Sequence, residues 1–152
     1  MDTPAQKKEL ISQIYKTIQS RLTACKQAME DYSEALLAEG KSSAGDKYET
    51  GRAMIHQEMD QTKAQRAQWE DHHVRLKSIE GMPAMNTAEL GALVQTNRGH
   101  FFLFAAIGQF EVDGLTIFSM GMTSPLGQAM LGKGVGSDFS FRGVSYSIVA
   151  IA

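Results

Sequence analysis

One apolar side chain every three or four residues, sustained over residues 10–36, is the feature that most constrains this chain. The positions form a single stripe: Leu10, Ile14, Ile18, Leu22, Cys25, Met29, Tyr32 and Leu36. This spacing predicts one helix of about 35 residues, because residues three and four apart share a helix face. Thr3, Pro4 and Gln6 supply an N-cap, a first-turn proline and a capping-box partner. A stripe one side chain wide cannot bury a broad face, which disfavours a globular helical bundle.

A second, weaker stripe follows a break at residues 39–45, which are rich in glycine and serine. Its members are Tyr48, Ile55, Met59, Thr62, Trp69, His73 and Leu76. Two narrow stripes joined by a short loop predict an antiparallel helical hairpin. Cys25 is the single cysteine of the chain. An internal disulfide and a cysteine-based zinc cluster are therefore excluded, and we expect Cys25 to be a small core residue.

The composition changes sharply near residue 80. Residues 1–80 contain 25 of the 32 charged side chains, 3 of the 14 glycines and no phenylalanine, whereas residues 81–152 contain all seven phenylalanines. The breaker Gly81-Met82-Pro83 stands at the change. We therefore predict two domains, a helical hairpin over residues 1–80 and a compact, turn-rich sheet over residues 81–152.

The second half carries strand signals around one short helix. Apolar runs flank glycine turns, which predicts an antiparallel sheet of about five strands, at residues 93–96, 101–104, 115–118, 139–141 and 146–151. Ser124 can cap the helix, Pro125 opens it and Gly132 ends it. The predicted fold class is α+β.

Charge and hydropathy exclude several classes of protein. The net charge of −2 and the pI near 6.1 argue against a protein that coats nucleic acid unaided. No apolar run approaches the roughly 20 residues that cross a bilayer, and the N-terminus lacks the apolar core of a signal peptide. The histidines show no zinc-ligand spacing, so no metal site is predicted. We expect a soluble, cytoplasmic protein without a membrane partner.

Three segments carry a resemblance to a known family. The run Ser124-Pro125-Leu126-Gly127-Gln128-Ala129-Met130-Leu131-Gly132-Lys133-Gly134-Val135-Gly136 resembles the signature of the Gre (GreA/GreB) transcription elongation factors. The lead-in at residues 90–94 and the closing residues 146–151 are similar as well. The resemblance implies an N-terminal antiparallel coiled coil and a C-terminal FKBP-like domain. It also implies RNA polymerase as the partner, with RNA and DNA met only through the polymerase complex.

The resemblance further implies a mechanism. Gre factors insert the coiled coil into the secondary channel of the polymerase, where two acidic residues at its tip help to hold a Mg²⁺ ion for hydrolysis of backtracked RNA. Those two positions fall here on Lys41 and Ala44, and neither side chain can bind Mg²⁺. We therefore expect a regulator of transcription elongation without efficient transcript cleavage. We expect that it is not itself an enzyme, at most a stimulator of RNA hydrolysis by the polymerase, and that it has no tightly bound cofactor; any Mg²⁺ is shared with the polymerase.

The candidate tip residues are Lys41, Ser42, Ser43, Asp46, Lys47 and Glu49. Asp46 and Glu49 restore an acid pair of the family's spacing, which allows a true cleavage factor. They also suit an N-cap and its capping-box partner at the start of the second helix. The basic residues of the tip suit phosphates or polymerase aspartates, although such charges also occur in any solvated loop.

Ser124 and Pro125 have two interpretations. As residues, they are a helix cap and a first-turn proline. By resemblance, they belong to the loop that docks the C-terminal domain on the polymerase. Two further hypotheses are an FKBP-like prolyl isomerase, which would need an aromatic-lined pocket, and a coiled-coil adaptor unrelated to transcription.

Overall fold

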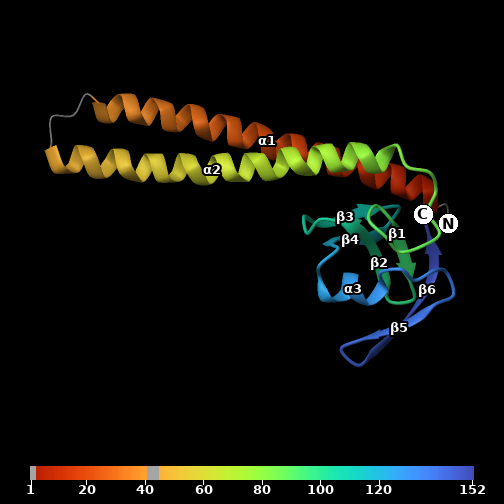
Figure 1. Cartoon of the computed structure of the whole chain (residues 1–152). Helices are drawn as coiled ribbons and strands as arrows, with labels where there is room; N and C mark the ends of the chain where they lie inside the picture. The colour runs from red at the N-terminus through yellow and green to blue at the C-terminus, as the bar shows by residue number, and fades with distance from the viewer. Residues whose placement is uncertain (1–2, 41–44) are drawn as a thin grey trace. The chain divides into compact units, whose positions relative to one another are not determined.

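The computed structural model describes residues 3–40 and 45–152, and it confirms the predicted α+β fold (Figure 1). Two long helices form a hairpin and are followed by a six-stranded sheet with one short helix. The chain divides into two compact units. We call Lys16–Val74 the hairpin unit, and Met1–Tyr15 together with Arg75–Ala152 the sheet unit. The composition change near residue 80 falls inside the sheet unit, and separate domains at 1–80 and 81–152 stay a prediction.

Helices α1 (Thr3–Gly40) and α2 (Gly45–Glu80) account for the two apolar stripes. In the hairpin unit they run side by side in opposite directions, orange and yellow-green in Figure 1. Ile18 and Cys25 of the first stripe are buried there, as expected for Cys25, and Thr62 is buried on α2. Trp69 is half-buried, with the Arg21 guanidinium carbon 5.8 Å from its ring centroid. Within the described residues, no helix combines the length and the apolar character needed to span a membrane.

The sheet has six strands in the order β3-β4-β2-β1-β6-β5. They are β1 (Leu93–Thr96), β2 (Gly99–Phe104), β3 (Gly108–Val112), β4 (Leu115–Gly121), β5 (Asp138–Phe141) and β6 (Val144–Ile151). The prediction of about five antiparallel strands needs correction, because β2 and β4 pair in parallel. The strand absent from the prediction, β3, is an edge strand whose only large apolar side chains are Phe110 and Val112. It pairs with the outer side of β4, which leaves β4 to lie beside β2 in the same direction.

Two hairpins of the sheet use the same tight turn. Asp113 and Gly114, between β3 and β4, have φ values of 52° and 77°. Arg142 and Gly143, between β5 and β6, have φ values of 52° and 76°. Two successive residues with positive φ define a turn whose twist matches that of paired strands, and glycine adopts this conformation without steric cost.

Both faces of the sheet are covered within the sheet unit. One face packs on helix α3 (Pro125–Met130) through a core that contains Val94, Phe101, Leu103, Met130, Phe139 and Ile148. The first turns of α1 lie on the other face, where Thr3 Oγ1 donates to Gln95 Oε1 at 3.5 Å and Gln13 Nε2 donates to the Glu111 carbonyl at 2.9 Å. Side chains of alternate strand positions are buried there with those of α1 and α2: Leu10, Ile14, Leu76, Ile79, Leu93, Phe102 and Ile117.

Candidate functional site

The predicted tip of the hairpin is described only in part. Lys41, Ser42, Ser43 and Ala44 lie outside the described residues. Helix α2 begins at Gly45, so the backbones of Asp46 and Lys47 belong to its first turn. Glu49 follows in the same helix with an exposed side chain. Asp46 and Glu49 are three residues apart along this helix.

The turn before α3 is built around the hydroxyl of Ser124. Ser124 has extended backbone angles, with φ −64° and ψ 148°, and its Oγ accepts a hydrogen bond from the Gly127 N–H at 3.1 Å. The same hydroxyl donates to the carbonyl of Gly121 at 2.8 Å. Pro125 follows in the first helical turn, where its missing N–H costs nothing. The predicted cap and helix start are therefore confirmed, and Ser124 also ties α3 to the end of β4.

Close packing fixes this turn further. A Cβ atom on Gly127 would lie 2.7 Å from the Gly121 carbonyl oxygen and 2.8 Å from Ser124 Oγ, so any other residue at this position would force the turn to shift. Gln128 Nε2 donates to the Met122 carbonyl at 2.6 Å. Thr123, Pro125 and Gln128 remain exposed. The turn thus presents a short surface whose backbone is held by three hydrogen bonds with the side chains of Ser124 and Gln128.

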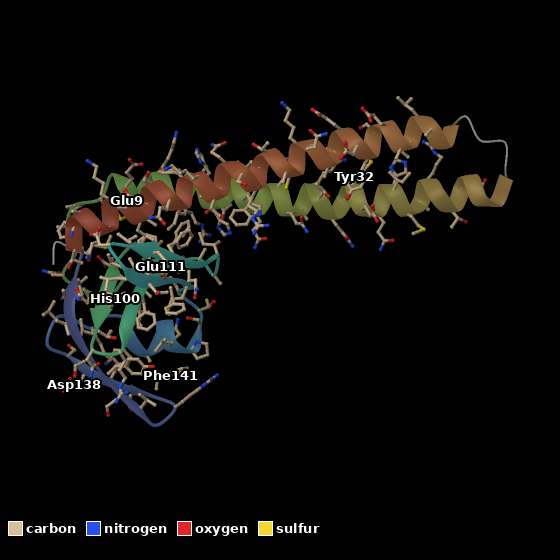
Figure 2. The ribbon with its side chains drawn as sticks, turned by 180° about the vertical axis from the view of Figure 1, so that it is seen from behind. Glu9, Tyr32, His100, Glu111, Asp138 and Phe141 are labelled. Atoms are coloured by element: carbon tan, nitrogen blue, oxygen red, sulfur yellow. The ribbon has the colours of Figure 1, made fainter. Side chains whose placement is uncertain are left out.

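A polar cluster that the sequence analysis missed joins the β1–β2 turn to β6. The Asn97 Oδ1 accepts from the Ser147 N–H at 2.8 Å, and Arg98 Nε donates to the Ser145 carbonyl at 2.6 Å. Ser147 Oγ donates to Asp138 Oδ1 on β5 at 2.6 Å; Figure 2 labels Asp138 at the start of that strand. Turn residues with short polar side chains between two strands are the only signal that could have indicated these contacts. The cluster fixes the β5–β6 hairpin to the rest of the sheet.

Burial perturbs two basic groups of the sheet unit. His100, labelled in Figure 2, lies on β2 between Gln95 of β1 and Ile117 of β4. Its Nε2 is buried and has no hydrogen-bond partner among the described residues, and burial lowers the pKa of the imidazole. The pKa of Lys7 on α1 is lowered for the same reason.

The pKa of a tyrosine hydroxyl in the sheet unit is shifted upward. Burial, and then a hydrogen bond of 2.8 Å from the Tyr15 hydroxyl to the Glu80 carboxylate, raise the pKa of Tyr15 to about 12. This contact joins the first turns of α1 to the last residue of α2. It is structural, since it connects the two helices where they belong to the sheet unit.

The described side chains at these places do not gather metal ligands. No group of three or more His, Cys, Asp or Glu side chains that could hold a metal ion occurs within residues 3–40 and 45–152, side chains at the hairpin end excepted. The His72 ring packs against the Trp69 ring, with centroids 5.4 Å apart and ring planes near perpendicular.

Comparison with known proteins gives no family assignment. Neither the models of known protein families nor the curated proteins include a match to this chain. There are two separate candidate sites, the start of α2 in the hairpin unit and the Ser124 turn in the sheet unit. Each must therefore be judged from its own residues.

Proposed function

We propose that this chain is a Gre-like regulator of transcription elongation. It binds RNA polymerase, inserts the tip of the helical hairpin into the secondary channel, and modulates the polymerase without efficient transcript cleavage. The observation that carries the proposal is a combination of two features. A two-helix hairpin of α1 and α2 precedes a mixed sheet, and in that sheet the Ser-Pro-Leu-Gly segment forms a helix start tied back to β4. This is the order of elements that the sequence resemblance implies.

The Ser124 turn is the proposed docking surface for the polymerase. A docking surface gains affinity when it is already held in its binding conformation, because less conformational entropy is lost on association. The Ser124 and Gln128 hydrogen bonds and the close approach at Gly127 hold the turn in this way. Pro125 is exposed on it and adds a rigid apolar contact.

The tip is proposed to act by occupancy rather than by metal binding. The two positions at which the resemblance requires carboxylates hold Lys41 and Ala44. Neither residue fits a Mg²⁺ ion, since a hard divalent cation takes oxygen ligands. A lysine that reaches acidic groups of the channel competes with the cation by Coulombic attraction, which is strong where water is partly excluded. We therefore derive no cleavage step through Mg²⁺ held by this chain.

Cleavage by a displaced acid pair is the alternative within the same architecture. It is favoured by the placement of Asp46 and Glu49 in the first turns of α2, three residues apart in one helix. An FKBP-like prolyl isomerase has less support, because Phe101, Phe102, Phe104 and Phe139 are buried and fill the sheet unit. A peptide isomerisation assay tests that hypothesis directly.

The test of binding is retention of the chain by RNA polymerase. We expect wild-type protein to be retained, and Pro125→Asp to bind at least about tenfold more weakly. Gln109→Asp is the matched control, since it adds the same charge on the exposed edge strand β3 of the same unit. Equal affinity of wild type and Pro125→Asp would remove the Ser124 turn from the interface. No retention of the wild type would reject the proposed function.

The test of mechanism is an RNA cleavage assay on backtracked elongation complexes. Wild-type protein should alter elongation but release little cleaved RNA, and Lys41→Asp combined with Ala44→Glu should confer cleavage. Robust cleavage by the wild type that disappears in Asp46→Ala or Glu49→Ala would instead establish the displaced acid pair.

A further inference from the structure

An open hollow of about 440 Å³ lies on one flank of the hairpin unit. Five residues of α1 and one of α2 line it: Lys26, Met29, Glu30, Ser33, Glu34 and Arg66. The proposed function does not use this flank, because it assigns roles only to the tip and to the Ser124 turn.

The apolar stripes of α1 and α2 meet along a line that we call the seam. The hollow exists because the stripe of α2 is interrupted at this seam. Ile55, Met59, Thr62 and Trp69 follow the spacing of four and three, and the repeat places Arg66 at the seam position between the last two. Its side chain is 44% exposed and its Nε lies 3.8 Å from Glu70 Oε1 one turn further on, so it does not fill the space beside Met29. An arginine at this position leaves the seam open on that side.

The seam is incompletely covered over the whole outer part of the hairpin. None of the side chains described in residues 26–38 and 49–61 is buried, although Met29, Tyr32 and Ile55 lie on the seam. Tyr32 is labelled in this part of Figure 2. Two helices alone leave the apolar residues between them open to solvent on both flanks. Two such pairs packed on each other form a four-helix bundle with an enclosed core.

The charges around the hollow are complementary to those of a second copy of the same surface. Lys26 and Arg66 are cationic, and Glu30 and Glu34 are anionic. Lys26 and Glu34 are eight residues apart on α1, which corresponds to ~12 Å along the helix. A two-fold axis through the hollow places the lining residues of two molecules face to face and antiparallel. The basic end of one molecule then meets the acidic end of the other.

We infer that this flank binds a second copy of the same chain, hairpin against hairpin and antiparallel, with Met29 packed at the centre and Lys26 and Arg66 facing Glu30 and Glu34 of the other copy. The pairing closes the open side of the seam in both molecules. It stands independently of the proposed function, since it rests only on residues of the hairpin unit.

The first test is the mass of the wild-type chain, residues 1–152, in solution. Sedimentation equilibrium over about 1–200 μM should show a monomer–dimer equilibrium, and added salt should shift it toward monomer, because exposed charge pairs are screened within about 8–10 Å at physiological ionic strength. A wild-type chain that remains monomeric at the highest concentration would overturn the inference, whichever other partner the hollow binds.

The second test uses charge reversal on each end of the hollow. Lys26→Glu with Arg66→Glu, and Glu30→Lys with Glu34→Lys, should each weaken self-association at least about tenfold. An equimolar mixture of the two variants should restore dimers, because opposite charges again face each other. Asp31→Lys with Glu58→Lys is the matched control: it reverses two exposed charges of the same helices that do not line the hollow, and it should dimerise as the wild type does.

Two results would contradict this interface. One is a dimer of unchanged strength in both charge-reversal variants. The other is a mixture of the two variants that stays monomeric while each variant retains wild-type helicity by far-ultraviolet circular dichroism. The helicity measurement separates loss of the interface from loss of the hairpin itself.

Discussion

The sheet unit and the hairpin unit use their apolar residues in different ways. Of the 21 apolar residues that are buried in the described part of the chain, only Ile18 and Cys25 belong to the hairpin unit. The sheet unit covers both faces of its sheet, whereas the seam of the hairpin stays half-exposed from residue 26 outward. The hairpin therefore takes its form mainly from helix-favouring local sequence and a narrow seam. The sheet unit takes its form from burial, and the two should respond differently to substitution.

The largest difference is expected for apolar truncation. Phe102→Ala removes a fully buried ring from the sheet unit and should cost about 3–5 kcal/mol of unfolding free energy. Met59→Ala on the half-exposed seam should cost only about 1 kcal/mol. Urea unfolding followed by circular dichroism measures both. Equal costs would mean that the hairpin has a core comparable to that of the sheet unit.

A smaller loss is expected when the Ser124 turn is overpacked. Gly127→Ala places a methyl group within 2.8 Å of two oxygen atoms, Gly121 O and Ser124 Oγ, so the turn must shift at a cost of about 1–3 kcal/mol. Gly114→Ala is not a suitable control, because its φ of 77° adds backbone strain. Gly121→Ala is suitable, since a Cβ there meets nothing within 4 Å. A stability of Gly127→Ala equal to that of Gly121→Ala would show that the turn is not rigid.

Loss of the helix cap should have a smaller effect again. Ser124→Ala removes the acceptor of the Gly127 N–H and should cost about 1 kcal/mol, the usual value for an N-cap serine. Ser124→Asp keeps an acceptor and should recover most of this stability. Thermal unfolding of the three proteins measures the difference, and a melting temperature of Ser124→Ala equal to that of wild type would contradict the assigned cap.

The smallest expected effect is a dependence of the sheet unit on pH. Since burial lowers the pKa of His100 below 6.5, the unfolded chain takes up a proton before the folded chain does, and stability falls as the pH is lowered below about 6.5. His100→Phe cannot be protonated and should flatten the slope of unfolding free energy between pH 7 and pH 5. His56→Gln, at an exposed position of the hairpin unit, should keep the slope. If His100→Phe leaves the slope unchanged, the pH dependence of the unfolding free energy comes from other groups.

The sequence predicts best where a local physical signal is strong. Ser124 and Pro125 mark the observed start of α3, because capping depends on neighbouring residues alone. The parallel pairing of β2 with β4 depends on contacts between distant segments, and the edge strand β3 has too few apolar residues to show a pattern. The Asn97 and Arg98 contacts to β6 could not be predicted either, since they join residues about 50 positions apart. The roles of the tip residues stay predictions.

The division of α1 and α2 between the two units has a consequence for how such a protein can vary in length. Both boundaries, after Tyr15 and before Arg75, fall inside continuous helices, and the hairpin unit is one uninterrupted insertion between them. Seven residues added to α1 and seven added to α2 would extend the seam by one repeat and keep its periodicity. The helical turns that cover the sheet would keep their residues and their register. The reach of the hairpin can therefore change in steps of about 10 Å without any change in the sheet unit.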